Sequence, residues 1–334
     1  MSDYKNITLD KGLYVGKGFS HNLEKLDPSE NYKGTSLEGL DAFARQLKRF
    51  DIKISGNNCD IIDKFFSSSQ TAALFPEFVV RAVENGIDNS ELLSAISAVK
   101  TKIDGLDYRS ITSSLTDTAN VTDLVNEGAS IPEMNITLSN NLVALRKYGR
   151  MLVASYEALR FQKIGVFSIA LKQIGEYIAY QQLNDAIDIL VNGNDGNSAC
   201  ENTEISGDLS YSDLVNLWSS FGQYKMTTIL VNPAVLPTLL NMTEFRDAAA
   251  GLNFHATGKL ITPFGAQILR SNYLPEDIIV AFDKNAALET VQSGDVTVDS
   301  DRLIDRQLER VAITSICGFN RISADAVKTL SFGS

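Results

Sequence analysis

The segment from residue 166 to residue 191 constrains the fold most strongly, because its apolar side chains recur with the period of an α-helix. These side chains are Phe167, Ala170, Leu171, Ile174, Ile178, Ala186, Ile187 and Leu190. A helix of this span is about 39 Å long, and Asn192-Gly193 ends it. Gly165 permits a break from a shorter helical piece that contains Tyr156 and Leu159. The pattern therefore predicts one long amphipathic helix.

A second helix is predicted at residues 75–86, FPEFVVRAVENG. Its apolar stripe consists of Phe75, Phe78, Val79, Ala82 and Val83. Pro76 suits the first helical turn, and Gly86 suits the left-handed position that follows a helix. Glu77 and Arg81 can pair on the other side. We expect the stripe to dock on the body of its own subunit, beside residues 166–191, and a further short helix at residues 90–100.

Residues 1–70 are mixed and polar, with one plausible helix at residues 37–50. Too few large apolar residues are present for an independent core, so this region is predicted to be an arm. Residues 105–132 are rich in Ser, Thr, Asp and Asn, and residues 133–142 alternate between apolar and polar side chains. Together these two segments predict a long β-hairpin that leaves the body of the protein.

Residues 192–207 have the composition of a linker. A small α/β domain is predicted after it, with a helix at residues 210–221, a buried strand at 226–231 and a helix that follows Asn232-Pro233. Further strands are predicted at residues 259–261, 266–270, 277–282, 296–298 and 310–316. The chain as a whole is expected to be α+β.

Composition excludes several classes. A formal net charge of −11 argues against a surface that holds nucleic acid by counterion release. Three cysteines without a CxxC motif suit a reducing compartment better than a disulfide framework. The first residues lead into no apolar run, so no signal peptide is expected, and no apolar run is long enough to predict a membrane span.

No motif predicts a catalytic, cofactor-binding or metal-binding residue. GLYVGKGFS, at residues 12–20, is one residue short of a phosphate loop, and Gly18 stands where Ser or Thr would bind magnesium. The only histidines, His21 and His255, have no Cys or carboxylate partner at ligand spacing. NGNDGNSACENTE, which begins at Asn192, does not align with a calcium loop.

Two groups of side chains remain open to interpretation. The aromatic residues Phe161, Phe167, Tyr177 and Trp218 could line a cofactor pocket, but their setting favours a place in the core. The basic residues Arg150, Arg160 and Lys163 could form a solvated face or contact an acidic neighbouring subunit. These two interpretations of the basic group are equally supported by the sequence.

The order of these parts resembles a major capsid protein of tailed bacteriophages with the Hong Kong 97-type fold. Residues 127–179 resemble the return of that family's extended loop into its spine helix, through Glu127-Gly128, Ile131-Pro132, Lys147, Gly149 and Ser155. VNPAVLPTLLNM (231–242) and TPFGAQILRSNYLPEDIIVAFDKNAA (262–287) resemble its axial domain. FPEFVVRAVENG resembles the element that joins its arm to the body. The resemblance covers about residues 70–328.

The resemblance implies five parts: an N-terminal arm (1–70), joining helices (71–104), an extended loop (105–148), a peripheral domain with its spine helix (149–207 and 285–320) and an axial domain (208–284 and 321–334). It implies a non-enzymatic shell subunit that forms pentamers and hexamers around double-stranded DNA, assembled in the host bacterial cytoplasm. DNA would be met only by non-specific proximity. Portal, scaffolding and decoration proteins are further candidate partners, and no membrane is implied.

The residues proposed as structural contacts are Phe75, Pro76, Phe78, Val79, Val83, Glu127, Arg150, Arg160, Lys163 and Trp218. No Lys, Asn or Glu is assigned to covalent cross-linking. Two alternatives are an encapsulin-type compartment shell and, from another class, a soluble α/β enzyme with an unrecognised site.

Overall fold

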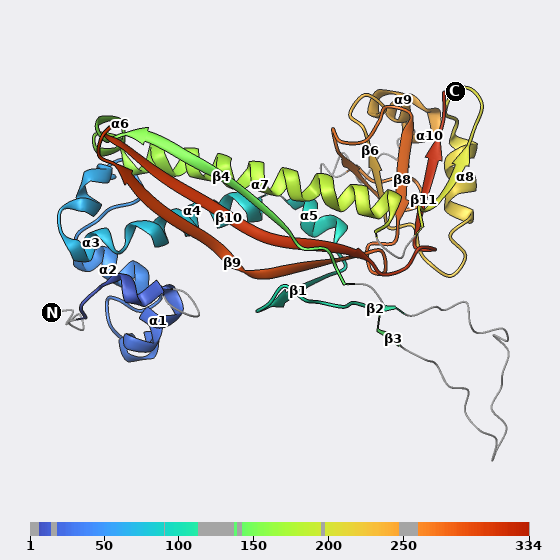
Figure 1. The fold of residues 1–334 in the computed structure, drawn as a ribbon. Coiled ribbons are helices and arrows are strands. Elements are labelled where there is room, and N and C mark those ends of the chain that lie inside the picture. The colour runs from blue at the N-terminus through green and yellow to red at the C-terminus, as the bar shows by residue number, and fades with distance from the viewer. Residues whose placement is uncertain are drawn as a thin grey trace, which may run out of the picture. The chain divides into compact units, whose positions relative to one another are not determined.

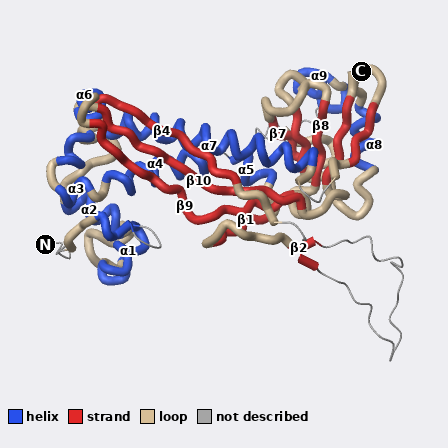
Figure 2. The backbone as a smooth tube through the Cα atoms, viewed as in Figure 1, coloured by secondary structure: helices blue, strands red, loops and turns tan. Residues whose placement is uncertain are grey.

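A computed structural model describes residues 7–14, 19–89, 91–112, 137–138, 142–194, 198–246 and 260–333. Contacts within the chain define two compact units. Unit 1 comprises residues 1–90, 147–180 and 295–316, and unit 2 comprises residues 91–146, 181–294 and 317–334. Four long elements contribute residues to both units (Figures 1 and 2): β4 (Arg146–Ser155), α7 (Ile164–Asn192), β9 (Leu288–Leu303) and β10 (Leu308–Arg321). The functional domains expected from the sequence stay a prediction.

Unit 1 combines short helices with the first part of α7. Its helices are α1 (Phe19–Leu26), α2 (Ala42–Arg49), α3 (Ser69–Ala72), α4 (Phe75–Asn89) and α6 (Tyr156–Arg160), with 3-10 turns η1 (Lys11–Tyr14), η2 (Ser29–Tyr32) and η3 (Ile62–Phe66). The helix predicted at residues 166–191 is α7, which begins two residues earlier and ends one residue later. The break before it falls at residues 161–163, so Gly165 lies inside the helix.

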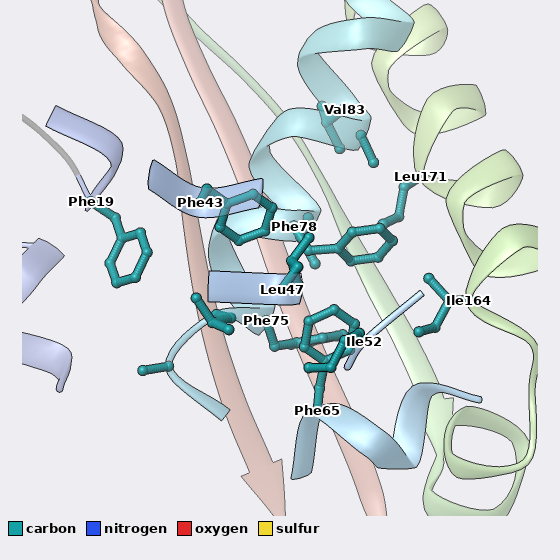
Figure 3. Close-up of a cluster of buried hydrophobic side chains, with 14 of the residues drawn as sticks. Phe19, Phe43, Leu47, Ile52, Phe65, Phe75, Phe78, Val83, Ile164 and Leu171 are labelled. Carbon is teal, nitrogen blue, oxygen red and sulfur yellow. The ribbon is translucent and has the colours of Figure 1, made fainter. Parts of the chain in front are cut away.

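One hydrophobic core joins the N-terminal region to α4 and α7 (Figure 3). Phe19 of α1, Phe43 of α2 and Phe65 of η3 are buried in the same cluster as the α4 stripe and Leu171 of α7. Phe75 stacks on Phe167 with ring centroids 6.1 Å apart. Within the subunit, the first 70 residues therefore share a core with the body although they lack an independent one. Their role as an arm toward a neighbouring subunit stays a prediction.

The expected helix end at Gly86 is wrong, because α4 continues to Asn89. Gly86 instead lies where α4 crosses α7. A Cβ on Gly86 would be 2.2 Å from the Lys172 carbonyl oxygen, and a Cβ on Gly175 would be 2.2 Å from the Val83 carbonyl oxygen. Two glycines, one from each helix, thus permit a backbone-to-backbone approach that any side chain would block.

A buried cation organises the N-terminal region of unit 1. Arg45 on α2 has no exposed side-chain area, and its Nε donates to the Asp27 carboxylate at 3.1 Å. The Arg45 guanidinium also lies 4.5 Å from the ring centroid of Tyr32, whose hydroxyl donates to Asp27 at 2.8 Å. Since an unpaired charge at such a site is costly, these contacts hold residues 27–45 in one arrangement.

Unit 2 contains a five-stranded sheet in the order β5-β11-β8-β6-β7 among the described residues. Its strands are β5 (Glu201–Glu204), β6 (Thr228–Val231), β7 (Gln267–Arg270), β8 (Ile278–Phe282) and β11 (Val327–Ser331). The helices α8 (Tyr211–Ser219), α9 (Leu236–Asn241) and α10 (Thr243–Arg246) accompany it, and α5 (Glu91–Ile96) lies earlier in the chain. All four residues of β6 are buried, as expected of the predicted apolar strand.

A four-stranded sheet has the order β1-β9-β10-β4. In unit 2, β1 (Val99–Ile103) pairs in parallel with β9, with Val99 opposite Glu289. The short strands β2 (Ile111–Thr112) and β3 (Thr137–Leu138) pair antiparallel beyond β1. They lie at the base of the predicted hairpin, most of whose residues, including 133–136 and 139–141, fall outside the described residues.

Several local expectations differ from the structure. Residues 146–155 form strand β4, where no strand was expected. The expected linker contains β5, which pairs with β11, because Lys328–Ser331 supplies a partner strand from the end of the chain. The helix expected at residues 90–100 is the shorter α5, and β1 follows it. Of the strand expected at residues 259–261, residue 259 lies outside the described residues, and Ile261 forms an isolated bridge to Gln267.

Candidate functional site

Within unit 1, α7 has one buried apolar face and one exposed face on which apolar side chains lie among the polar residues Gln173 and Glu176. Phe167, Leu171 and Ile178 are buried in the core. Val166 and Ile169, at 53% and 57% exposed, lie on the other face with Tyr177 and Tyr180. Exposed apolar side chains that gather on one helix face favour contact with another protein surface. The second face therefore has the character of a surface that another protein covers.

Strand β4 carries further exposed apolar side chains. Met151 and Val153 alternate with inward residues and are more than half exposed. Arg150, between Gly149 and Met151, places its guanidinium carbon 3.6 Å from the ring centroid of Tyr177. This contact orders the exposed aromatic ring by a cation–π attraction.

A second exposed apolar site lies where the β9–β10 turn meets α6. Ile304 and Phe161 are 82% and 76% exposed, which are the largest values among the exposed large apolar residues of the described chain. The two segments are joined, because the Tyr156 amide donates to the Gln307 carbonyl oxygen at 3.0 Å. Apolar side chains this exposed favour contact with another protein surface.

In unit 2, Trp218 of α8 is 48% exposed and stacks on Phe264, with ring centroids 6.1 Å apart. Tyr211 contacts Phe264 and Phe245 from the same region. A half-exposed tryptophan supported by other rings is a common anchor in protein interfaces.

An open groove of about 580 Å³ lies elsewhere in unit 2. Its lining includes Leu209, Phe332 and the acidic residues Asp208, Glu276 and Asp277. Nothing in its geometry resembles a nucleophile with an adjacent base. In the described ranges there is no group of three or more His, Cys, Asp or Glu side chains that could hold a metal ion. Among the same residues, no helix has the length and apolarity needed to cross a bilayer.

The structure separates the sequence-predicted contact residues. Phe75, Phe78, Val79 and Val83 are buried in the core of unit 1, and Pro76 lies half-buried in the first turn of α4. Glu127 lies outside the described residues. The candidate contacts on α4 therefore belong to the subunit interior and are not a free surface.

The basic residues do not share one partner. Arg160 lies 3.5 Å from the Asp63 carboxylate, and Lys163 Nζ donates to the Cys59 carbonyl oxygen at 2.9 Å. Arg150 contacts Tyr177 as described above. Each side chain thus has its own contact within unit 1, and all three remain largely exposed.

The expectation that four aromatic residues lie in the core is correct for Phe167 and wrong for Phe161, Tyr177 and Trp218, which are exposed. Sequence reasoning also missed Ile304, Met151 and Val153. A signal was present for α7, where apolar residues occur on both faces of the helical wheel. The turn between β9 and β10, which contains Ile304, has no such pattern in the sequence.

Similarity to solved structures supports the fold. The virus-like particle from Pyrococcus furiosus has a TM-score of 0.52 and 14% identity, covering 77% of this chain and 99% of that chain. The capsid of the native GTA particle has a TM-score of 0.52 and 13% identity, covering 75% and 91%. The capsid of the empty GTA particle gives 0.52 and 14%, covering 72% and 89%. The architecture is that of shell-forming capsid proteins, the Hong Kong 97-type fold.

The family follows from a second comparison. The family model described as phage capsid protein matches residues 140–320, which is more than half of the chain. No curated protein matches the chain. The chain belongs to the phage capsid protein family, and it is a structural protein that self-associates into a capsid shell, not an enzyme.

Proposed function

We propose that this chain assembles as pentamers and hexamers into an icosahedral shell that encloses double-stranded DNA. The observation that carries the proposal is the group of apolar side chains that the subunit leaves exposed on one face of α7, namely Val166, Ile169, Tyr177 and Tyr180. In an isolated monomer these apolar side chains stay in contact with water. Repeated heterologous contacts between copies would bury them, and such contacts can close into rings.

The parts of the chain take separate roles in this proposal. Residues 208–284 and 321–334 form the axial domain, which meets its copies around the five-fold and six-fold axes, with Trp218 at its surface. Residues 149–207 and 285–320 form the peripheral domain. Residues 105–148 reach a neighbouring subunit, joined to the body through residues 71–104, and residues 1–70 lie against another neighbour. Many moderate contacts then add through avidity.

The surroundings of the shell follow from its charge and its class. Assembly takes place in the host bacterial cytoplasm, with portal, scaffolding and decoration proteins as partners. The net charge of −11 supports a wall that meets packaged DNA only by non-specific proximity. An encapsulin-type shell shares the fold, but no separate observation favours it.

Electron microscopy of the purified chain tests the proposal. We expect closed particles from the wild type and a loss of particles from Ile169→Asp, because a carboxylate cannot be buried unpaired at an apolar contact. Gln223→Asp introduces the same charge at an exposed turn of unit 2 and is the matched control, which should assemble normally. A wild type that stays monomeric under all assembly conditions contradicts the proposal. Normal particles from Ile169→Asp would show that the exposed face of α7 is not part of the contact between copies.

A further inference from the structure

A single buried carboxylate in unit 2 accepts hydrogen bonds from three hydroxyl groups. Glu289, in β9, is 7% exposed. Its Oε1 accepts hydrogen bonds from the Thr101 hydroxyl at 2.6 Å and from the Tyr108 hydroxyl at 2.7 Å. Its Oε2 accepts a hydrogen bond from the Ser110 hydroxyl, which is itself buried. Within the described residues, no Lys or Arg forms an ion pair with Glu289.

The three donors come from the stretch that leads into the extended loop. Thr101 lies in β1, and Tyr108 and Ser110 lie after the turn at residues 104–107, directly before β2. One carboxylate therefore ties the chain on both sides of that turn to β9. Because hydrogen bonds to an ionised acceptor are short and directional, this arrangement specifies the path of the chain and not merely its burial.

Neighbouring contacts extend the same connection to the returning chain. The Val143 amide donates to the Tyr108 carbonyl oxygen at 2.9 Å. Ser293 Oγ, four residues along β9 from Glu289, donates to the Gly105 carbonyl oxygen at 2.8 Å. We call residues 101–112, 137–138 and 142–143 the loop stem. Hydrogen bonds thus connect both strands of the stem to β9. The outgoing strand bonds to β9 directly, and the returning strand bonds to Tyr108, which bonds to Glu289.

The chemistry of the donors suits a permanent connection. A tyrosine hydroxyl is protonated and can donate at neutral pH, and burial, followed by the hydrogen bond to Glu289, raises the pKa of Tyr108 further. An apolar residue at position 289 could fill the same space, and it would leave three hydroxyls without their acceptor. A buried carboxylate at this place therefore contributes geometry that packing alone does not supply.

We propose that Glu289 is a positioning residue for shell assembly, which fixes the path of the loop stem and through it supports the contact of the extended loop with a neighbouring copy. This inference rests on the proposed role of the extended loop. Its expected consequence is that stem geometry can be lost while the subunit stays folded, because Glu289 and its donors lie outside the unit 1 core that contains Phe75 and outside the unit 2 core that contains Leu214.

Three variants of the full chain test the proposal by particle yield and by amide hydrogen exchange. Glu289→Leu should lower the yield of closed particles by about ten-fold or more, and accelerate exchange in residues 101–110 by about ten-fold, with β6 unchanged. Glu289→Gln keeps an acceptor and should restore most of the yield. Thr290→Val removes the adjacent Ser97–Thr290 hydrogen bond of 2.6 Å without touching the stem and should assemble normally.

Two results overturn the inference. Glu289→Leu could assemble with wild-type yield, or it could unfold globally, which would make Glu289 a general folding residue. If Glu289→Leu is insoluble, the double variant Thr101→Val and Tyr108→Phe removes two donors and decides by the same yield and exchange measurements.

A loop deletion separates this inference from the proposed function. Since Thr112 and Thr137 are paired antiparallel, a short Gly-containing turn can replace residues 113–136. If that deletion assembles normally, the proposed role of the loop is wrong. If the deletion fails to assemble while Glu289→Leu assembles normally, only the role of Glu289 is wrong.

Discussion

The close crossing of α4 and α7 makes Gly175→Ala a sensitive test of the fold. The added methyl group would lie 2.2 Å from the Val83 carbonyl oxygen and 3.0 Å from the Gly86 Cα atom. Both neighbours are backbone atoms, so no side chain can rotate away. To restore ordinary contact, the helices must move apart by about 1 Å, and a gap of that size forfeits about a quarter to a half of each dispersion contact across it.

The expected loss of stability follows from two opposing terms. Overpacking of a rigid site costs about 1–3 kcal/mol, and the backbone neighbours place Gly175→Ala at the upper end. Alanine is better than glycine in a helix interior by about 1 kcal/mol, which offsets part of this cost. We expect a net loss of about 2 kcal/mol in the free energy of unfolding, equivalent to a fall in Tm of about 3 °C for a chain of 334 residues.

Thermal unfolding of the unassembled subunit, followed by circular dichroism, measures this loss. Gly165→Ala is the matched control in the same helix, because its methyl group would meet only the Cys59 sulfur, at 3.3 Å, and a side chain can adjust. The control should keep a Tm close to that of the wild type. A Gly175→Ala subunit as stable as the control would refute the argument that this crossing requires glycine.

Three further outcomes are expected. Arg45→Met should lower the free energy of unfolding by about 3 kcal/mol or more in urea, because it leaves the Asp27 carboxylate buried without a cation; adding Asp27→Asn should recover part of the loss. Phe78→Asp should abolish folding before assembly, judged by circular dichroism, whereas a folded mutant that only fails to assemble would place Phe78 at an intersubunit surface. In the native subunit at pH 8, a thiol reagent should label the half-buried Cys59 first; Cys317 should stay unlabelled, because burial raises its pKa to about 12, and early labelling of Cys317 would contradict its burial.

Local patterns predicted local structure well. The apolar period at residues 166–191 predicted α7 almost to its ends, and the run at residues 226–231 predicted the buried strand β6. Gly86 shows the limit of the same reasoning. A glycine near the end of an apolar stripe fits a helix stop, and it also fits a close helix crossing; only the position of α7 decides between them.

Strands that depend on distant partners were the least predictable elements. The polar residues of β5 form a strand because β11 lies beside them, and none of the four side chains of β5 is buried. The candidate assembly surfaces were equally difficult to predict from the sequence. Tyr177 and Trp218 are of residue types that are often buried. Their exposure depends on which face of each helix the rest of the chain covers.

The sequence by itself therefore determined the α+β class, the long helix, the small α/β domain and, through the order of parts, the resemblance to phage capsid proteins. These features depend on the period of side chains along one element, which is a local property. The tertiary structure alone decided the role of Gly86, the exposed face of α7 and the partners of Glu289. The donors of Glu289 lie 179 to 188 positions away in the chain. Contacts over such separations leave no periodic trace in the sequence, because they depend on how complete elements meet.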